Sequence, residues 1–170
     1  APDVFELAVG SGPSTLGELQ LGDVVFASAA LGRAMLDVFP GNGPLQLIAM
    51  GTGVTPLRAV IQEQVARQEK GELPARSLGL LHGCRDESEQ LFADEFAGLR
   101  ARGLLDYRPV LSRPEPGWPG LRGRVQEHVD AFSPTGASYL VCGSIGMVED
   151  VVARLVSGGV SATSILAEGY

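Results

Sequence analysis

Short, mostly apolar runs of residues recur along the chain from residue 45 onward. Runs of this kind, bounded by turn residues, predict strands that are buried on both faces of a sheet. The predicted strands are residues 45–50, 78–82, 107–111, 138–142 and 162–166. Between them apolar residues recur at helical spacing, which predicts helices at residues 56–69, 88–102, 125–132 and 147–156.

Strands that alternate with helices in this way indicate one fold class. Five apolar strands joined by helical crossovers predict an α/β fold with a doubly wound five-stranded parallel sheet. Ligands in such folds bind beyond the carboxyl ends of the strands. The loops that follow the strands are therefore the first candidates for a binding site.

The first 44 residues have a different pattern. Residues 5–9 alternate apolar and polar side chains, and residues 23–27 form a second strand-like run after a Gly-Asp turn. A dense turn cluster at residues 40–44 marks the boundary. We expect a β-rich segment at residues 1–44 and a separate α/β domain at residues 45–170.

Composition narrows the functional classes. The chain of 170 residues is 45% hydrophobic and carries 20 acidic against 13 basic residues, which argues against a nucleic-acid footprint. Two Cys and two His, widely spaced, exclude a zinc site and a disulfide framework. No apolar run approaches the roughly 20 residues of a membrane span, and no leader pattern opens the sequence. We expect a cytoplasmic protein, and the missing initiator Met suggests a processed chain or a fragment.

A glycine-rich turn follows the first predicted strand directly. It comprises Gly51, Thr52, Gly53, Val54, Thr55 and Pro56. Glycines let a backbone approach a ligand closely, Thr55 suits a helix N-cap, and Pro56 suits the first helical position. The helix N-terminus then offers N–H groups and a positive dipole end to a pyrophosphate. The alternative is a glycine-rich turn that binds nothing.

Four arginines follow the second and third predicted strands: Arg85, Arg113, Arg122 and Arg124. Guanidinium forks match phosphate geometry, so these residues are candidate phosphate ligands. The alternative is an ordinary solvated face.

Cys142 and Gly143 end the fourth predicted strand, and Met147 follows. They could lie beside a bound ring, or Cys142 could be a small buried hydrophobe. His82 and His128 have no spacing that places either beside Cys142, so a cysteine nucleophile is disfavoured. If the first strand lies between Cys84 and Cys142, the two are roughly 10 Å apart and cannot form a disulfide.

These motifs, in this order, resemble the ferredoxin–NADP reductase superfamily, which includes the diflavin reductases. Residues 47–58 resemble its strand, GTG(I/V)xP loop and helix start, and residues 83–85 with 91–96 resemble its GCR…LYxxE segment. Residues 139–143 with Met147 resemble its VCGxxxM motif, and residues 168–170 resemble its terminal acid–X–Tyr.

The resemblance implies a coenzyme site. The pyrophosphate would bind the turn of residues 51–56, and the nicotinamide would lie near Cys142, Gly143 and Met147. Tyr170 would cover the flavin, and Glu168 would lie close to the hydride path. The 2′-phosphate of NADP would be held by Ser112, Arg113, Arg122, Arg124 and Gln126, with help from Arg85. Arg124 stands where plant-type members have Tyr, so NADP is the expected coenzyme and NAD remains an alternative.

The front part resembles the end of the family's flavin-binding barrel. Gly12, Ser14 and Thr15 resemble the GxxS/T loop that holds the flavin pyrophosphate. The RxY(S/T) motif would lie before residue 1, so residues 1–44 would be only a partial antiparallel β-barrel. The chain would then be a fragment, a subunit that takes strands from another chain, or a decayed flavoprotein.

The function that the resemblance implies is an NAD(P)H oxidoreductase domain that passes hydride between NADP(H) and FAD. An electron-transfer protein would be its partner, and FAD would need upstream strands or another chain to bind. The alternative is a flavin-free module that binds a dinucleotide to sense it or to dock to another subunit.

Overall fold

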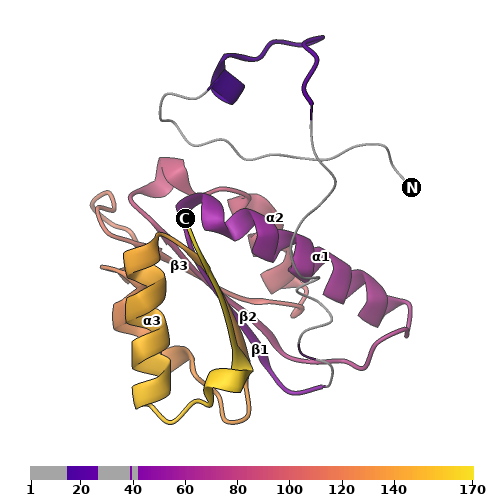
Figure 1. The fold of residues 1–170 in the computed structure, drawn as a ribbon, viewed down its shortest axis with the longest axis vertical. Coiled ribbons are helices and arrows are strands. Elements are labelled where there is room, and N and C mark those ends of the chain that lie inside the picture. The colour runs from indigo at the N-terminus through magenta and orange to yellow at the C-terminus, as the bar shows by residue number, and fades with distance from the viewer. Residues whose placement is uncertain (1–14, 27–38, 40–41) are drawn as a thin grey trace.

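The structure is a computed structural model in which residues 15–26, 39 and 42–170 are described (Figure 1). A parallel sheet of six strands dominates it, in the order β4-β3-β2-β1-β5-β6. The strands are β1 (Leu45–Met50), β2 (Leu78–Cys84), β3 (Asp106–Leu111), β4 (Leu121–Arg122), β5 (Ser138–Gly143) and β6 (Ile165–Gly169). The helices are α1 (Val54–Glu69), α2 (Ala93–Ala101) and α3 (Ile145–Ser157).

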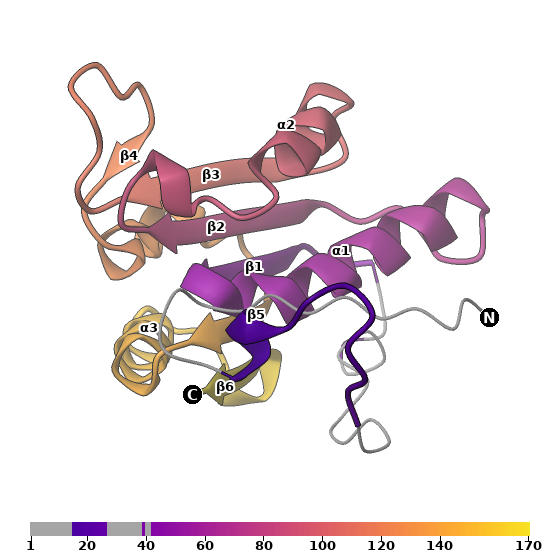
Figure 2. The same cartoon turned by 90° about the horizontal axis from the view of Figure 1, so that it is seen from above.

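The sheet is doubly wound, as the sequence predicts. From β1 the chain moves outward through β2 and β3 to β4, and it then returns to place β5 on the other side of β1. The helices α1 and α2 cover one face of the sheet, and α3 covers the other (Figures 1 and 2). Loops after β1 and β5 therefore leave the sheet on opposite faces, which opens a crevice at the carboxyl edge between them.

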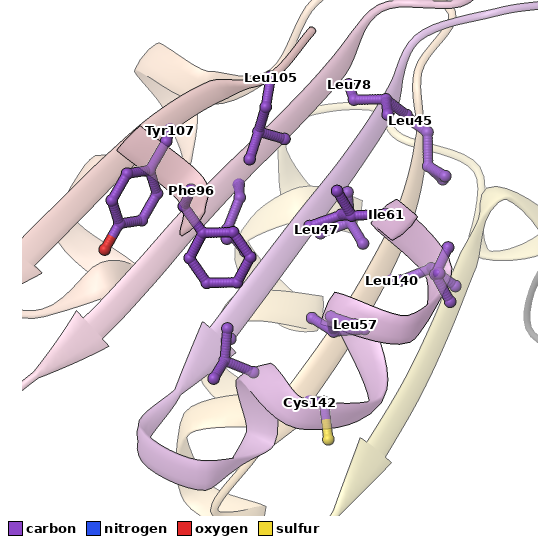
Figure 3. Close-up of a cluster of buried hydrophobic side chains, with 14 of the residues drawn as sticks. Leu45, Leu47, Leu57, Ile61, Leu78, Phe96, Leu105, Tyr107, Leu140 and Cys142 are labelled. Carbon is purple, nitrogen blue, oxygen red and sulfur yellow. The ribbon is translucent and has the colours of Figure 1, made fainter. Parts of the chain in front are cut away.

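Two layers of apolar side chains hold the helices to the sheet. Leu57 and Ile61 of α1 lie over Leu47 of β1, and all three are fully buried (Figure 3). Phe96 of α2 packs on Tyr107 of β3 with ring centroids 5.2 Å apart. Each buried side chain of this size contributes roughly 1.5–3 kcal/mol of transfer free energy, so this packing fixes the scaffold beneath the carboxyl edge.

The strands differ from the predicted ones at both edges of the sheet. The sixth strand, β4, has only two residues and follows a proline-rich loop, so no apolar run announces it. The last strand begins at Ile165, later than predicted, because residues 162–164 form a 3-10 helix. The Ser161 side chain caps that turn by accepting a hydrogen bond from the Thr163 N–H.

Two predicted helices are shorter or tighter than expected. In place of the single helix predicted at residues 88–102, the chain forms a 3-10 helix at Glu87–Glu89 and then α2, because Phe92 adopts a left-handed φ of 59° that separates the two. Residues 125–132 form two 3-10 helices, Val125–His128 and Asp130–Phe132. Their buried residues still face one side, which explains why the spacing resembled that of an α-helix.

The front segment is only partly described. The predicted strand at residues 5–9 lies outside the described residues, and residues 23–26 form no strand. A strand needs a partner for its hydrogen bonds, and no described residue pairs with this run. Within the described residues, no helix combines the length and the apolar character needed to cross a membrane.

Candidate functional site

A cavity of about 550 Å³ lies at the carboxyl edge of the sheet, and we call it the carboxyl-edge cavity. The loops that follow β1, β2, β3, β4 and β5 all contribute to it. Its lining residues are Met50, Gly51, Gly83, Cys84, Arg85, Glu89, Ser112, Gly123, Arg124, Val125, Gln126, Ser144, Gly146, Met147 and Asp150. Of the predicted coenzyme contacts, Gly51, Arg85, Ser112, Arg124, Gln126 and Met147 meet here.

The two glycines of the turn after β1 have different surroundings. Gly51 has a left-handed φ of 53°, and a Cβ added there would meet nothing within 4 Å. Gly51 therefore leaves backbone open to a ligand in the carboxyl-edge cavity. A Cβ at Gly53 would lie 2.4 Å from the Cys142 carbonyl oxygen, so Gly53 is required for packing of the turn against β5.

The start of α1 corrects the predicted capping. The left-handed Gly51 turns the chain at once into a 3-10 helix at Gly51–Gly53, so α1 begins at Val54. Thr55 lies inside the first helical turn instead of at the N-cap, and its buried hydroxyl has no hydrogen-bond partner among the described residues. Pro56 is exposed at the third helical position. Val54 is buried in the core.

The four arginines divide into two pairs. Arg85 and Arg124 line the carboxyl-edge cavity, whereas Arg113 and Arg122 do not. The Arg122 guanidinium donates to the Trp118 carbonyl oxygen at 3.2 Å. Among the described residues, no ion pair involves Arg85, Arg113 or Arg124. The cavity therefore presents two guanidinium groups that keep their charge available to an anion.

Two acidic side chains, Asp150 and Glu89, also line the cavity, and neither was predicted there from the sequence. The Gln126 side-chain amide donates to an Asp150 carboxylate oxygen at 3.2 Å, and both residues line the cavity. Glu89 also lines it and accepts the Arg85 backbone N–H at 3.3 Å. Asp150 follows Met147 by one helical turn, so its position on the cavity face could have been found from helical spacing.

The end of β5 holds Cys142 and Gly143 in tight packing. The Cys142 side chain is buried on the α1 face of the sheet, and burial, with the Glu168 charge, raises its pKa to about 11. A Cβ at Gly143 would lie 2.3 Å from the Met147 methyl group. Ser144 caps α3 by accepting the Met147 N–H. Neither Cys142 nor Gly143 lines the carboxyl-edge cavity.

Cys142, Glu168 and Tyr170, which were expected near the nicotinamide, the hydride path and the flavin, lie close together at the ends of β5 and β6. Glu168 on β6 lies opposite Cys142 in the parallel register, and the Tyr170 N–H donates to the Gly143 carbonyl oxygen at 3.1 Å. The Tyr170 hydroxyl reaches across the end of β5 to β1, where it donates to the Met50 carbonyl oxygen at 3.2 Å. It also shares a hydrogen bond of 2.9 Å with the Thr52 hydroxyl.

Chemically, neither cysteine is poised to attack a substrate. Burial raises the pKa of Cys84 to about 12, with Glu89 and Asp86 adding to the effect. His82 lies 3.4 Å from the Cys84 sulfur, and burial lowers its pKa to about 4, so the pair stays neutral. β1 lies between the strands of Cys84 and Cys142, and both thiols are free, in agreement with the predicted separation.

Most of the residues predicted to hold the flavin pyrophosphate cannot be assessed from the structure. Gly12 and Ser14 lie outside the described residues, and Thr15 opens a 3-10 helix at Thr15–Glu18.

Comparisons with known proteins agree with this geometry. Residues 47–153 match the family described as the oxidoreductase NAD-binding domain. A ferredoxin–NADP reductase B from Sorangium cellulosum is 33% identical over 98% of this chain and 72% of its own length. A bifunctional cytochrome P450/NADPH–P450 reductase from Fusarium oxysporum is 36% identical over 86% of this chain, which spans 15% of that relative.

Solved structures show the same fold. An Amycolatopsis cytochrome P450 reductase is 29% identical, with a TM-score of 0.63 over 75% of this chain and 37% of its own. The CS-b5R domains of human Ncb5or superpose with a TM-score of 0.73 over 89% of this chain and 44% of theirs, at 22% identity. The glycine turn, the strand order and these matches together show that the chain belongs to the oxidoreductase NAD-binding domain family of the ferredoxin–NADP reductase superfamily.

Proposed function

We propose that the chain passes hydride between NADP(H) and FAD as the nucleotide-binding part of an electron-transfer flavoprotein. The carboxyl-edge cavity carries this proposal, because it joins an open turn at Gly51 to the two available guanidinium groups of Arg85 and Arg124. Its volume of about 550 Å³ suits a bound small molecule, since ligand pockets span roughly 300–1,000 Å³. The relatives named as NADPH-dependent reductases support the reaction class.

The pyrophosphate and the 2′-phosphate of the coenzyme would bind at different places, the first at the end of β1 and the second beyond the ends of β2 and β4. The turn at Gly51–Gly53 and the start of α1 offer backbone N–H groups and the positive end of a helix dipole to the pyrophosphate. Arg85 and Arg124 would bind the 2′-phosphate, because guanidinium groups pair with phosphate oxygens through two parallel hydrogen bonds. Ser112, Arg113, Arg122 and Gln126 remain proposed contacts near this phosphate.

The nicotinamide would lie over the end of β5, where the Tyr170 side chain now crosses from β6 to β1. Cys142 and Glu168 would position the ring, since a neutral buried thiol of raised pKa is a poor nucleophile. Tyr170, 60% exposed, offers its ring as a cover for a flavin. When bound, FAD supplies the ring that exchanges hydride with the coenzyme.

Residues 1–44 are the proposed remnant of the flavin-binding barrel, with Gly12, Ser14 and Thr15 as its flavin contacts. A redox protein would be the electron partner. A toluene monooxygenase electron-transfer component from Pseudomonas putida is among the relatives, which supports a partner of this kind.

Calorimetric titration of the chain with NADP⁺ and NAD⁺ tests the coenzyme assignment. We expect NADP⁺ to bind more tightly, and Arg124→Ala to weaken NADP⁺ at least about tenfold while changing NAD⁺ little, because a hydrogen bond to a charged group contributes roughly 1.5–3 kcal/mol. Arg154→Ala is the matched control, since this arginine is exposed and paired with Asp130. Equal affinities for the two coenzymes, or no loss of NADP⁺ in Arg124→Ala, would contradict the assignment.

A further inference from the structure

A buried histidine lies directly beneath the glycine turn. His82 is fully inaccessible to solvent, although it continues an apolar strand that contains Leu78 and Leu80 on the same face. Burying an imidazole among leucines costs free energy unless the polar atoms of the ring are hydrogen-bonded. Within the described part of the chain, the ring's hydrogen bond to the backbone is to the turn itself, where its Nε2 lies 3.2 Å from the Gly51 carbonyl oxygen.

The direction of this hydrogen bond follows from its partners. A carbonyl oxygen only accepts, so Nε2 carries the hydrogen and donates to Gly51. The Nδ1 atom has no hydrogen-bond partner among the described residues, which fits a neutral ring protonated on Nε2. The nearby Cys84 thiol lies 3.4 Å from the same Nε2 and stays protonated, so it offers no charge that would pull the ring away.

This contact determines which way one peptide of the turn faces. A trans peptide is planar, so its C=O and N–H groups point in opposite directions. With the Gly51 carbonyl directed at the His82 ring, the Thr52 N–H points away from that ring. Glycine at φ 53° places little steric restraint on a flip of this peptide. The Gly51 carbonyl oxygen also accepts the Val54 backbone N–H, so the His82 ring is a second donor to the same oxygen and adds to the hold on this orientation.

We propose that His82 is a positioning residue that fixes the Gly51–Thr52 peptide with its N–H directed toward the coenzyme pyrophosphate. The inference rests on the proposed function, because it assumes that the turn binds a dinucleotide. Without the histidine, the Gly51 carbonyl keeps only the Val54 donor, so the flipped peptide is more populated and the apparent affinity falls with the fraction of chains that is competent. The effect is specific to ligands that carry a pyrophosphate.

Two fragments of the coenzyme separate this role from a general effect on the fold. ADP-ribose contains the pyrophosphate without the 2′-phosphate, whereas 2′-AMP contains the 2′-phosphate without the pyrophosphate. In His82→Phe, which keeps a ring and removes the donor, we expect ADP-ribose to bind roughly five- to tenfold more weakly. Binding of 2′-AMP should stay within about twofold of the parent chain, because this fragment has no pyrophosphate for the turn to bind.

Two further variants complete the comparison. His82→Gln keeps an N–H donor of similar reach and should restore ADP-ribose binding to within about threefold of the parent. Val60→Ala removes buried side-chain volume from the middle of α1, so it should lower stability without changing the ratio of the two fragment affinities.

The outcomes distinguish the two proposals. If the parent chain binds neither fragment, the proposed function is wrong, and the role of His82 is wrong with it. If the parent binds both fragments and a folded His82→Phe binds ADP-ribose equally well, only the role of His82 is overturned. Should His82→Phe fail to fold, ¹⁵N spectra of the parent decide: a His82 ring protonated on Nε2 at pH 7 supports the proposal, and an Nδ1–H tautomer or an imidazolium overturns it.

Discussion

Burial gives His82 a measurable effect on stability as well as a position beneath the turn. Its pKa falls from 6.5 to about 4 in the folded chain, since desolvation disfavours the charged ring. The unfolded chain therefore binds more protons between these two pH values, and acid favours unfolding. The neighbouring Cys84 thiol stays protonated throughout this range and adds nothing to the dependence.

We expect the free energy of unfolding to decrease as the pH falls from about 6.5 to about 4, and His82 to account for about 3 kcal/mol of that decrease. Denaturant unfolding of the parent and of His82→Gln across this range measures the difference. The parent should lose more stability than the variant on acidification. Parallel curves for the two proteins would show that His82 titrates normally in the folded state.

The two glycines of the turn are expected to differ in role, since Gly51 affects ligand binding and Gly53 affects the stability of the fold. Gly51→Ala should weaken ADP-ribose binding and lower stability by only about 1 kcal/mol, the scale of a left-handed non-glycine residue. Gly53→Ala should instead destabilise the chain severely, because its methyl group would lie 2.4 Å from the backbone of Cys142. Thermal unfolding and calorimetry on both variants provide the check. A stable Gly53→Ala with normal binding would show that β5 and the turn can move apart.

At the scale of elements, β6 is linked to the end of β1 by Tyr170, the residue that follows β6. The Tyr170 hydroxyl bonds to Met50 and Thr52, although β5 lies between β6 and β1. A ligand ring placed over the end of β5 has to displace this side chain. The Tyr170 side chain therefore covers the surface that we propose for the nicotinamide.

We expect Tyr170→Ser to tighten NADP⁺ binding by about tenfold, since two hydrogen bonds and a ring no longer oppose the nicotinamide. Tyr170→Phe keeps the ring without the hydroxyl and should give an intermediate affinity. Binding of 2′-AMP, which has no nicotinamide, serves as the internal reference and should not change. If all three proteins bind NADP⁺ alike, the tail does not cover the nicotinamide site.

Much of the architecture could be predicted from local patterns, because buried strands and amphipathic helices leave periodic apolar residues. Residues 45–50 and 138–142 were recognisable for this reason. The two-residue β4 has no such pattern, and the start of α1 depends on a φ that sequence spacing does not reveal. The contact between His82 and Gly51 joins residues that are far apart in the sequence, so it could be found only once the strand order was known.

The whole fold protects both thiols. Cys84 and Cys142 are buried in the sheet, and their pKa values are raised to about 12 and about 11. An aromatic disulfide reagent at pH 8 should therefore react with neither thiol in the native chain and with both after unfolding. The reaction rate then measures global opening, and immediate modification of either thiol under native conditions would reveal a local opening at the carboxyl edge.

The central place of β1 also bears on how this protein could be redesigned. Loops after β2, β3 and β4 carry the arginines on one flank, whereas β5 and β6 carry Cys142 and Glu168 on the other. In the proposed arrangement, substitutions that change the preferred dinucleotide would fall on the first flank, away from Cys142 and Glu168. The two flanks meet at the turn at Gly51 and at the hydrogen bond between Gln126 and Asp150, and in the proposed arrangement the turn would bind the pyrophosphate that both coenzymes share.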